Sequence, residues 1–178
     1  ATLPFTTVLP AVLSTKQWLQ SANWIKHCFG DMGPIRFRHP RKAAVCILLL
    51  SAAGLAGIGV GPNFLFPLLW ISPLLILASL QTLMKERHIF SVIAAGDWHG
   101  AVAAALAALV CGFFWEMWNY FSLAKWTYSV PLVHRFLIFE MPLLGYGGYL
   151  PFGLECMVIG AMLEKLFNSN HRSGTISN

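Results

Sequence analysis

Long runs of apolar residues alternate with short polar segments along the chain. Residues 43–60, 64–84, 100–118 and 151–167 are poor in charged side chains, and each approaches the roughly 20 residues that a helix needs to cross a hydrocarbon core of about 30 Å. A fifth run at 3–19 is interrupted by prolines. Because lipid offers backbone groups no hydrogen-bond partner, we expect helices. The pattern predicts an all-α polytopic membrane bundle with four transmembrane helices plus a partial N-terminal one.

The polar segment before the first full run divides the chain into two parts. We expect residues 1–42 to hold the partial span and a basic amphipathic cytoplasmic segment, in which Trp18, Ala22 and Ile25 share one face of a surface helix. We expect residues 43–178 to form a four-helix membrane domain. Because the chain begins abruptly in membrane-like sequence, we also expect it to be a fragment with further upstream spans.

Glycine, proline and aspartate modify individual predicted helices. Gly57 and Gly61 lie four residues apart, a spacing that permits close helix packing. Pro67 and Pro73 should kink or unwind the run at 64–84. Asp97 precedes the run at 100–118, where its carboxylate is expected to accept hydrogen bonds from free backbone N–H groups at the helix start.

The loop between the third and fourth full runs contains turn signals. We expect a short interfacial helix over residues 132–140, ended by Pro142 because the residue before a proline disfavours the α region. The glycines at 145–148 predict a flexible re-entrant loop. Pro151 is then expected in the first turn of the last helix.

Composition agrees with a membrane location. The 178 residues are 57% hydrophobic and only 11% charged, with a mean hydropathy of +0.64, whereas charged residues alone reach about 25% in soluble domains. Threading the four spans in order places ten of the twelve lysines and arginines on one side. By the positive-inside rule this side is the cytoplasm. We therefore expect a bacterial inner (plasma) membrane protein with a cytoplasmic C-terminus.

The basic residues flank the predicted spans and explain the net charge of +5. They are not interleaved with aromatic residues in the way that base stacking requires. We therefore expect membrane lipids as partners, together with partner chains if the protein belongs to a complex, and no nucleic acid.

Candidate chemistry is concentrated between residues 115 and 155. This stretch contains three of the seven acids of the chain, Glu116, Glu140 and Glu155. Intramembrane acids are functional candidates because they are costly to bury, and carboxylates partly desolvated beside aromatic rings can serve as general acids. We take these three glutamates as the catalytic candidates. Asn119 and Tyr120 should lie on the same helix face as Glu116.

Aromatic and polar side chains accompany these acids. Their rings could form an interfacial belt, or could hold a cationic headgroup or stabilise a carbocation. The ligand-binding candidates are Trp115, Trp118, Asn119, Tyr120, Trp126, Tyr128, His134 and Tyr146. No cofactor is expected, and no metal either, because His99 and His134 fall on opposite predicted sides and no HExxH motif occurs.

The strings WEMWNYFSLAKWTYSVP and FEMPLLGYGGYLPFGLEC resemble those of a group of bacterial multi-span membrane proteins that share WExWN, KWxYxxP and FEMPLLG motifs. The resemblance extends over most of the chain, from FTTVLPAVL and the GDW turn onward. It implies kinship with that group. It implies no activity, and no site residue is transferred from it.

Three functions are compatible with these patterns. The first is a carboxylate and aromatic site at the outer membrane face that binds or acts on a lipid-like or isoprenoid-like ligand. The second is a non-catalytic subunit of a larger membrane complex, in which the acids pair with basic residues such as Lys125 or Arg135. The third is a small-molecule transporter, favoured by the broken helices.

Overall fold

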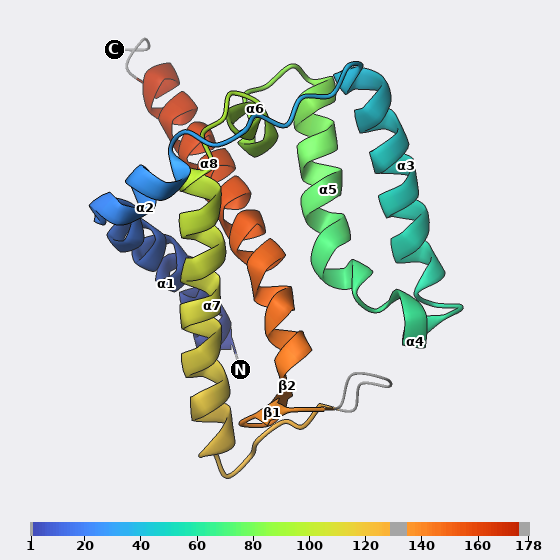
Figure 1. The fold of residues 1–178 in the computed structure, drawn as a ribbon, viewed down its shortest axis with the longest axis vertical. Helices are drawn as coiled ribbons and strands as arrows, with labels where there is room; N and C mark the ends of the chain where they lie inside the picture. Colours follow the sequence, from blue (N-terminus) through green and yellow to red (C-terminus); the bar gives the residue numbers. More distant parts are fainter. Residues whose placement is uncertain (1, 129–134, 175–178) are drawn as a thin grey trace.

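The computed structural model describes the backbone of residues 2–128 and 135–174. In this part the chain is mostly helical, with one two-stranded sheet (Figure 1). The elements are α1 (Thr2–Ser21), α2 (Asn23–Phe29), α3 (Pro40–Gly57), α4 (Pro62–Leu65), α5 (Leu68–Leu83), α6 (Ile89–Ile93), α7 (His99–Tyr120), β1 (Leu137–Ile138), β2 (Met141–Pro142), the 3-10 helix η1 (Leu143–Gly148) and α8 (Tyr149–Gly174). The all-α prediction is confirmed.

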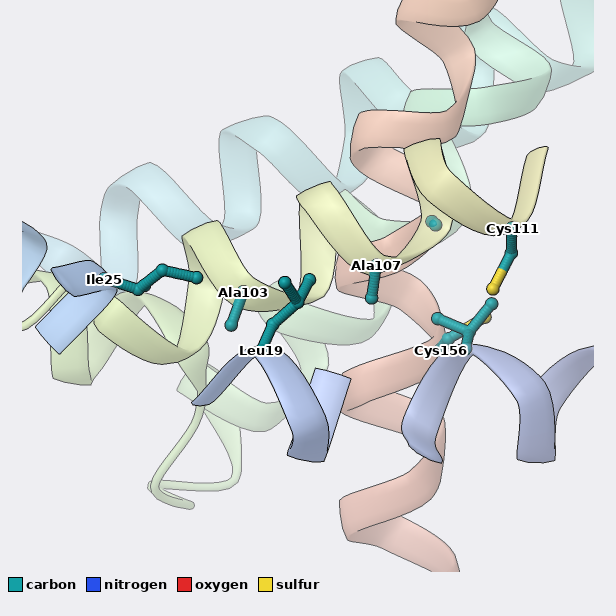
Figure 2. Close-up of a cluster of buried hydrophobic side chains, with 8 residues drawn as sticks. Leu19, Ile25, Ala103, Ala107, Cys111 and Cys156 are labelled. Carbon is teal, nitrogen blue, oxygen red and sulfur yellow. The ribbon is translucent and has the colours of Figure 1, made fainter. Parts of the chain in front are cut away.

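Helix α7 lies at the centre of the bundle, where it packs against α1, α2 and α8. Its alanines at 103, 104, 107 and 108 are fully buried. Figure 2 shows Leu19 and Ile25 pointing toward α7 at Ala103 and Ala107. Small side chains let helix backbones approach closely, so that van der Waals contact holds them together even where the surroundings are apolar.

The crossing of α7 and α8 depends on Gly153. A Cβ atom at this position would lie 2.1 Å from the carbonyl oxygen of Ala104, so any larger residue would push the two backbones apart. A second buried cluster, formed by Leu74, Ile89, Ile93, Ala101 and Val158, joins α5 and α6 to α7 and α8.

Helices α3 and α5 form an antiparallel pair that reaches the rest of the bundle through contacts between α5 and α8 (Figure 1). A Cβ atom at Gly54 would lie 2.6 Å from the side chain of Leu68, and one at Gly57 would lie 3.0 Å from that of Leu65. The glycines of α3 therefore serve packing within the chain. Gly61 lies beyond the end of α3.

The predicted span at 64–84 is broken, as its prolines indicated. Pro67 separates the short helix α4 from α5, and Pro73 lies inside α5. A further expectation is confirmed, because Pro151 lies in the first turn of α8. The N-cap of α7 is Trp98 and not Asp97, which the sequence suggested, but the Asp97 carboxylate still accepts a hydrogen bond of 3.0 Å from the backbone N–H of His99, the first residue of the helix.

Two of the described helices, α3 and α7, are long and apolar enough to cross a membrane. Helix α5 is apolar but has only 16 residues. Its length follows from the break at Pro67, since a proline removes a backbone donor and crowds the preceding turn.

The expected surface helix through Trp18, Ala22 and Ile25 is wrong. The chain leaves helical geometry at Ala22 (ψ 113°), between α1 and α2. Ile25 is consequently buried against α7, whereas the Trp18 side chain is 69% exposed. Burial of Ile25 against the alanines of α7 therefore outweighs the hydrogen bonds that a continuous helix through Ala22 would have made.

The expected helix at 132–140 is also wrong over its described residues, 135–140. There the chain forms β1 and the turn that leads to β2, with positive φ at Phe136 (52°) and Phe139 (57°). These left-handed residues interrupt any helix. The backbone N–H of Leu143 then donates to the carbonyl of Phe136 (3.0 Å). The glycine-rich stretch that follows is the 3-10 helix η1 instead of a flexible loop.

Candidate functional site

Glu116 lies in the last turns of α7, and its side chain is only 1% exposed. The space around it depends on Gly112, one turn earlier on the same helix. A Cβ atom at Gly112 would lie 2.5 Å from the ring of Tyr149, so the glycine lets that ring lie directly against α7. The first residue of α8 is thereby placed within reach of the carboxylate.

One carboxylate oxygen of Glu116 accepts two hydrogen bonds from phenols. The Tyr128 hydroxyl donates to Oε1 at 2.6 Å, and the Tyr149 hydroxyl donates to the same atom at 2.9 Å. The other oxygen, Oε2, is buried and has no partner among the described residues. A buried polar atom without a partner costs about 1–3 kcal/mol, and more when it is charged. This arrangement leaves one acceptor open to a proton-bearing group.

The loop after α7 is held in place by Asn119, which is itself buried. Its amide forms a pair of hydrogen bonds with the backbone of Trp126. Oδ1 accepts from the Trp126 N–H, and Nδ2 donates to the Trp126 carbonyl, both at 2.9 Å. The indole Nε1 of Trp126 donates to the Tyr128 hydroxyl at 2.7 Å. A continuous donor chain therefore runs from this indole through the phenol to Glu116.

Tyr128 and Tyr146 are held in the neutral form. Burial raises the pKa of Tyr128, and its hydrogen bond to Glu116 raises it further. Burial also raises the pKa of Tyr146 to about 12, assisted by the charge of Glu116. The Tyr146 hydroxyl donates to the carbonyl of Ile138 (3.3 Å), and its ring lies beside that of Tyr149. Near neutral pH both groups are therefore hydrogen-bond donors and not bases.

Glu140 belongs to a different environment. Its carboxylate forms a partly exposed ion pair with Lys125, and the Lys125 ammonium lies 5.2 Å from the centroid of the Tyr120 ring. Tyr120 is exposed and also contacts the ring of Phe139. The structure therefore groups Tyr120 with this surface ion pair and not with Glu116. Exposed pairs of this kind contribute little to stability.

Glu155 occupies a third environment, on α8 facing α5. Its Oε1 accepts a hydrogen bond of 3.1 Å from the backbone N–H of Leu74. Leu74 follows Pro73, whose ring lacks an N–H and disturbs the helical ladder. The carboxylate thus gives the backbone of the turn that contains Pro73 an acceptor from a neighbouring helix. The three candidate glutamates have no partner in common.

The tryptophans divide in the same way. Trp115 is partly buried and lies beside the Tyr149 ring, with 6.2 Å between ring centroids. Trp118 is 61% exposed and contacts the ring of Phe114, away from Glu116. Trp126 is 53% exposed, but it is joined to the site through its hydrogen bonds with Asn119 and Tyr128. His134 lies outside the described residues. The structure therefore brings together Glu116, Trp115, Asn119, Trp126, Tyr128 and Tyr146, and adds Tyr149 and Gly112.

Sequence reasoning left Tyr149 and Gly112 out of the candidate site. A usable signal was present, because Gly112 and Glu116 lie four residues apart on one helix face. A glycine one turn from a buried acid marks a place where another element can approach closely. Among the side chains that the structure describes, 6–128 and 135–168, no group of three or more histidine, cysteine or acidic residues is arranged to hold a metal ion.

The chain was compared with protein-family models, with curated proteins and with solved structures, and none of them matches it. The candidate site is therefore defined by its geometry alone.

Proposed function

We propose that this chain is a multi-pass protein of the bacterial inner membrane, with four spans and a partial fifth. In this proposal α3, α5, α7 and α8 cross the membrane, and the basic residues around α2, α6 and the end of α8 face the cytoplasm. Glu116 then lies near the outer face. Kinship with the bacterial group that shares the WExWN and FEMPLLG motifs is part of the same proposal.

We further propose that the Glu116 site binds a lipid-like or isoprenoid-like molecule that carries a hydroxyl or ammonium group. The observation that carries this proposal is the buried Oε2 without a partner, next to an Oε1 that two phenols already occupy. A ligand hydroxyl or ammonium could supply the missing donor. The apolar surroundings favour a ligand whose remaining atoms are hydrocarbon.

The experiment measures binding of farnesol, an isoprenoid alcohol, to the protein purified in mild detergent. The shift of the thermal unfolding midpoint and the amount of retained farnesol are both recorded. The matching hydrocarbon farnesene, which has no donor, is the ligand control. We expect farnesol to bind and Glu116→Gln to weaken it about tenfold, because a hydrogen bond to a charged acceptor is lost.

Glu155→Gln and Glu140→Gln are the matched variants, since they make the same substitution at the two other glutamates. They should bind farnesol like the unmodified chain. Equal binding of farnesol and farnesene, or unchanged farnesol binding by Glu116→Gln, would refute the proposed site.

A second candidate is a non-catalytic subunit of a membrane complex. It is favoured by the contacts of Glu140 and Glu155, which are engaged with Lys125 and with the backbone of Leu74. Exposed Leu49 and Leu50 on α3 offer an apolar face to lipid or to a neighbouring chain. Purification from native membranes distinguishes the two functions. A stoichiometric partner chain, with no farnesol binding, would favour the subunit.

A further inference from the structure

A pocket of about 460 Å³ lies at the end of the bundle away from Glu116. It is enclosed by the first half of α3, the last half of α5, helix α6 and residues 35–37. Figure 1 shows the segment before α3 passing across α6 and the end of α5, which line the same pocket. The volume falls within the range of about 300–1,000 Å³ that is typical of small-molecule sites.

The walls of the pocket are mostly apolar. Phe37, Ile47, Leu75 and Phe90 contribute large side chains, and Ala43 and Ala78 leave the space open. Phe37 is also exposed, so apolar surface continues outward from the pocket. These walls suit a hydrocarbon chain and do not suit a small soluble anion by itself.

The charged residue of the pocket is Arg36. Its Nε donates to the carbonyl of Ala94 at 3.0 Å, which fixes the guanidinium and leaves its other N–H groups available. No acidic side chain lines the pocket. The sequence places Arg38, Arg41 and Lys42 just beyond, and the ion pairs found among the described residues involve other cations. The pocket itself therefore offers a cation and no carboxylate to a bound anion.

His88 supplies a second polar contact. The Thr82 hydroxyl donates to the carbonyl of Ala78 (2.7 Å), so its bond of 3.0 Å with His88 Nε2 must use the histidine as donor. The other nitrogen, Nδ1, is then an acceptor in the neutral ring. This nitrogen is buried away from solvent, and His88 forms a capping box with Ser91 at the start of α6. The contacts of His88 with Thr82 and Ser91 therefore fix this wall of the pocket.

We infer that this pocket binds an anionic phospholipid, with its phosphate at Arg36 and an acyl chain between α3 and α5. The cation and the apolar walls of the pocket match these two parts of such a molecule. Its place among unpaired basic residues also fits the cytoplasmic leaflet, where anionic lipids attract such clusters. This site is independent of the Glu116 site.

The test measures binding of fluorescent phosphatidylglycerol to the intact chain in mild detergent, with phosphatidylcholine and glycerol phosphate as comparison ligands. Arg36→Gln removes the proposed phosphate contact. Arg87→Gln is the matched control, because it removes the same charge from an exposed residue that does not line the pocket. Ala43→Leu fills part of the pocket without changing charge. Circular dichroism and gel filtration check that each variant is folded.

We expect phosphatidylglycerol to bind more tightly than phosphatidylcholine. Arg36→Gln should raise its Kd about tenfold, and Arg87→Gln should change it less than about twofold. Ala43→Leu should also weaken binding.

Equal weakening by Arg36→Gln and Arg87→Gln would show diffuse surface attraction and overturn the site. Glycerol phosphate binding as tightly as the lipid would show a soluble anion site and overturn the acyl-chain assignment. Undiminished phosphatidylglycerol binding by a folded Ala43→Leu variant would also overturn the acyl-chain assignment.

Discussion

Replacement of Gly112 by alanine tests how the candidate site is built, without removing any of its polar groups. Alanine in a helix interior is favoured over glycine by about 1 kcal/mol, so the substitution would stabilise α7 if the helix were isolated. In the structure, however, the new Cβ atom would lie 2.5 Å from the Tyr149 ring. No real contact is that short, so the ring must move.

The cost of this movement can be estimated from the contacts of Tyr149. Overpacking of a close contact costs about 1–3 kcal/mol. Loss of the 2.9 Å hydrogen bond to Glu116 costs about 1.5–3 kcal/mol, because the acceptor is a carboxylate. These losses exceed the gain in helix propensity. We therefore expect Gly112→Ala to lower the free energy of unfolding by about 1.5–5 kcal/mol.

The assay is equilibrium unfolding in mixed detergent micelles, followed by circular dichroism, for Gly112→Ala alone and in a Tyr149→Leu background. Leucine has no ring to collide with, so in that background the alanine should stabilise the protein by about 1 kcal/mol. A contact between the new Cβ atom and the Tyr149 ring requires this reversal of sign. If Gly112→Ala stabilises the protein equally in both backgrounds, the contact between Gly112 and Tyr149 does not position the site.

Three further predictions follow from other contacts. Gly153→Ala should lower the unfolding free energy by at least about 2 kcal/mol in the same assay, because its Cβ atom would lie 2.1 Å from a backbone carbonyl oxygen of α7. Gly147→Ala is the control and should be nearly neutral, because no atom lies within 4 Å of the Cβ position there. Because the pKa of Tyr146 is raised from 10 to about 12, the folded state keeps a proton that the unfolded state loses. Stability should therefore fall as pH rises from 10 to about 12, and Tyr146→Phe should weaken this dependence in pH-dependent unfolding measurements. Asn119→Ala should cost about 2–3 kcal/mol by removing two buried hydrogen bonds, and limited proteolysis should show faster cleavage of residues 121–128.

The helices that could be predicted from the sequence are those whose signals are local. The alanine-rich run of α7 indicated a central helix, and Pro67 marked the break before α5. The hairpin at 137–142 could not be predicted in this way. It depends on left-handed residues at Phe136 and Phe139, which are not glycines and so give no conformational signal.

The candidate site shows the same division. Burial of Glu116 beside aromatic residues was predictable from its position in an apolar run. The separation of Glu140 and Glu155 from it was not, because their partners are Lys125 and the backbone of Leu74. The Leu74 contact spans 81 residues, and nothing near Glu155 in the sequence reveals it. Tertiary pairing of this kind can be recognised only when the helices have been placed.

The hydrogen bond between Glu155 and Leu74 also constrains how the protein is made. Helix α5 leaves the ribosome well before α8, so this contact can form only after 81 further residues have been synthesised. Until then the backbone beside Pro73 is without the Glu155 acceptor. The junction between α5 and α8 is therefore completed late in synthesis.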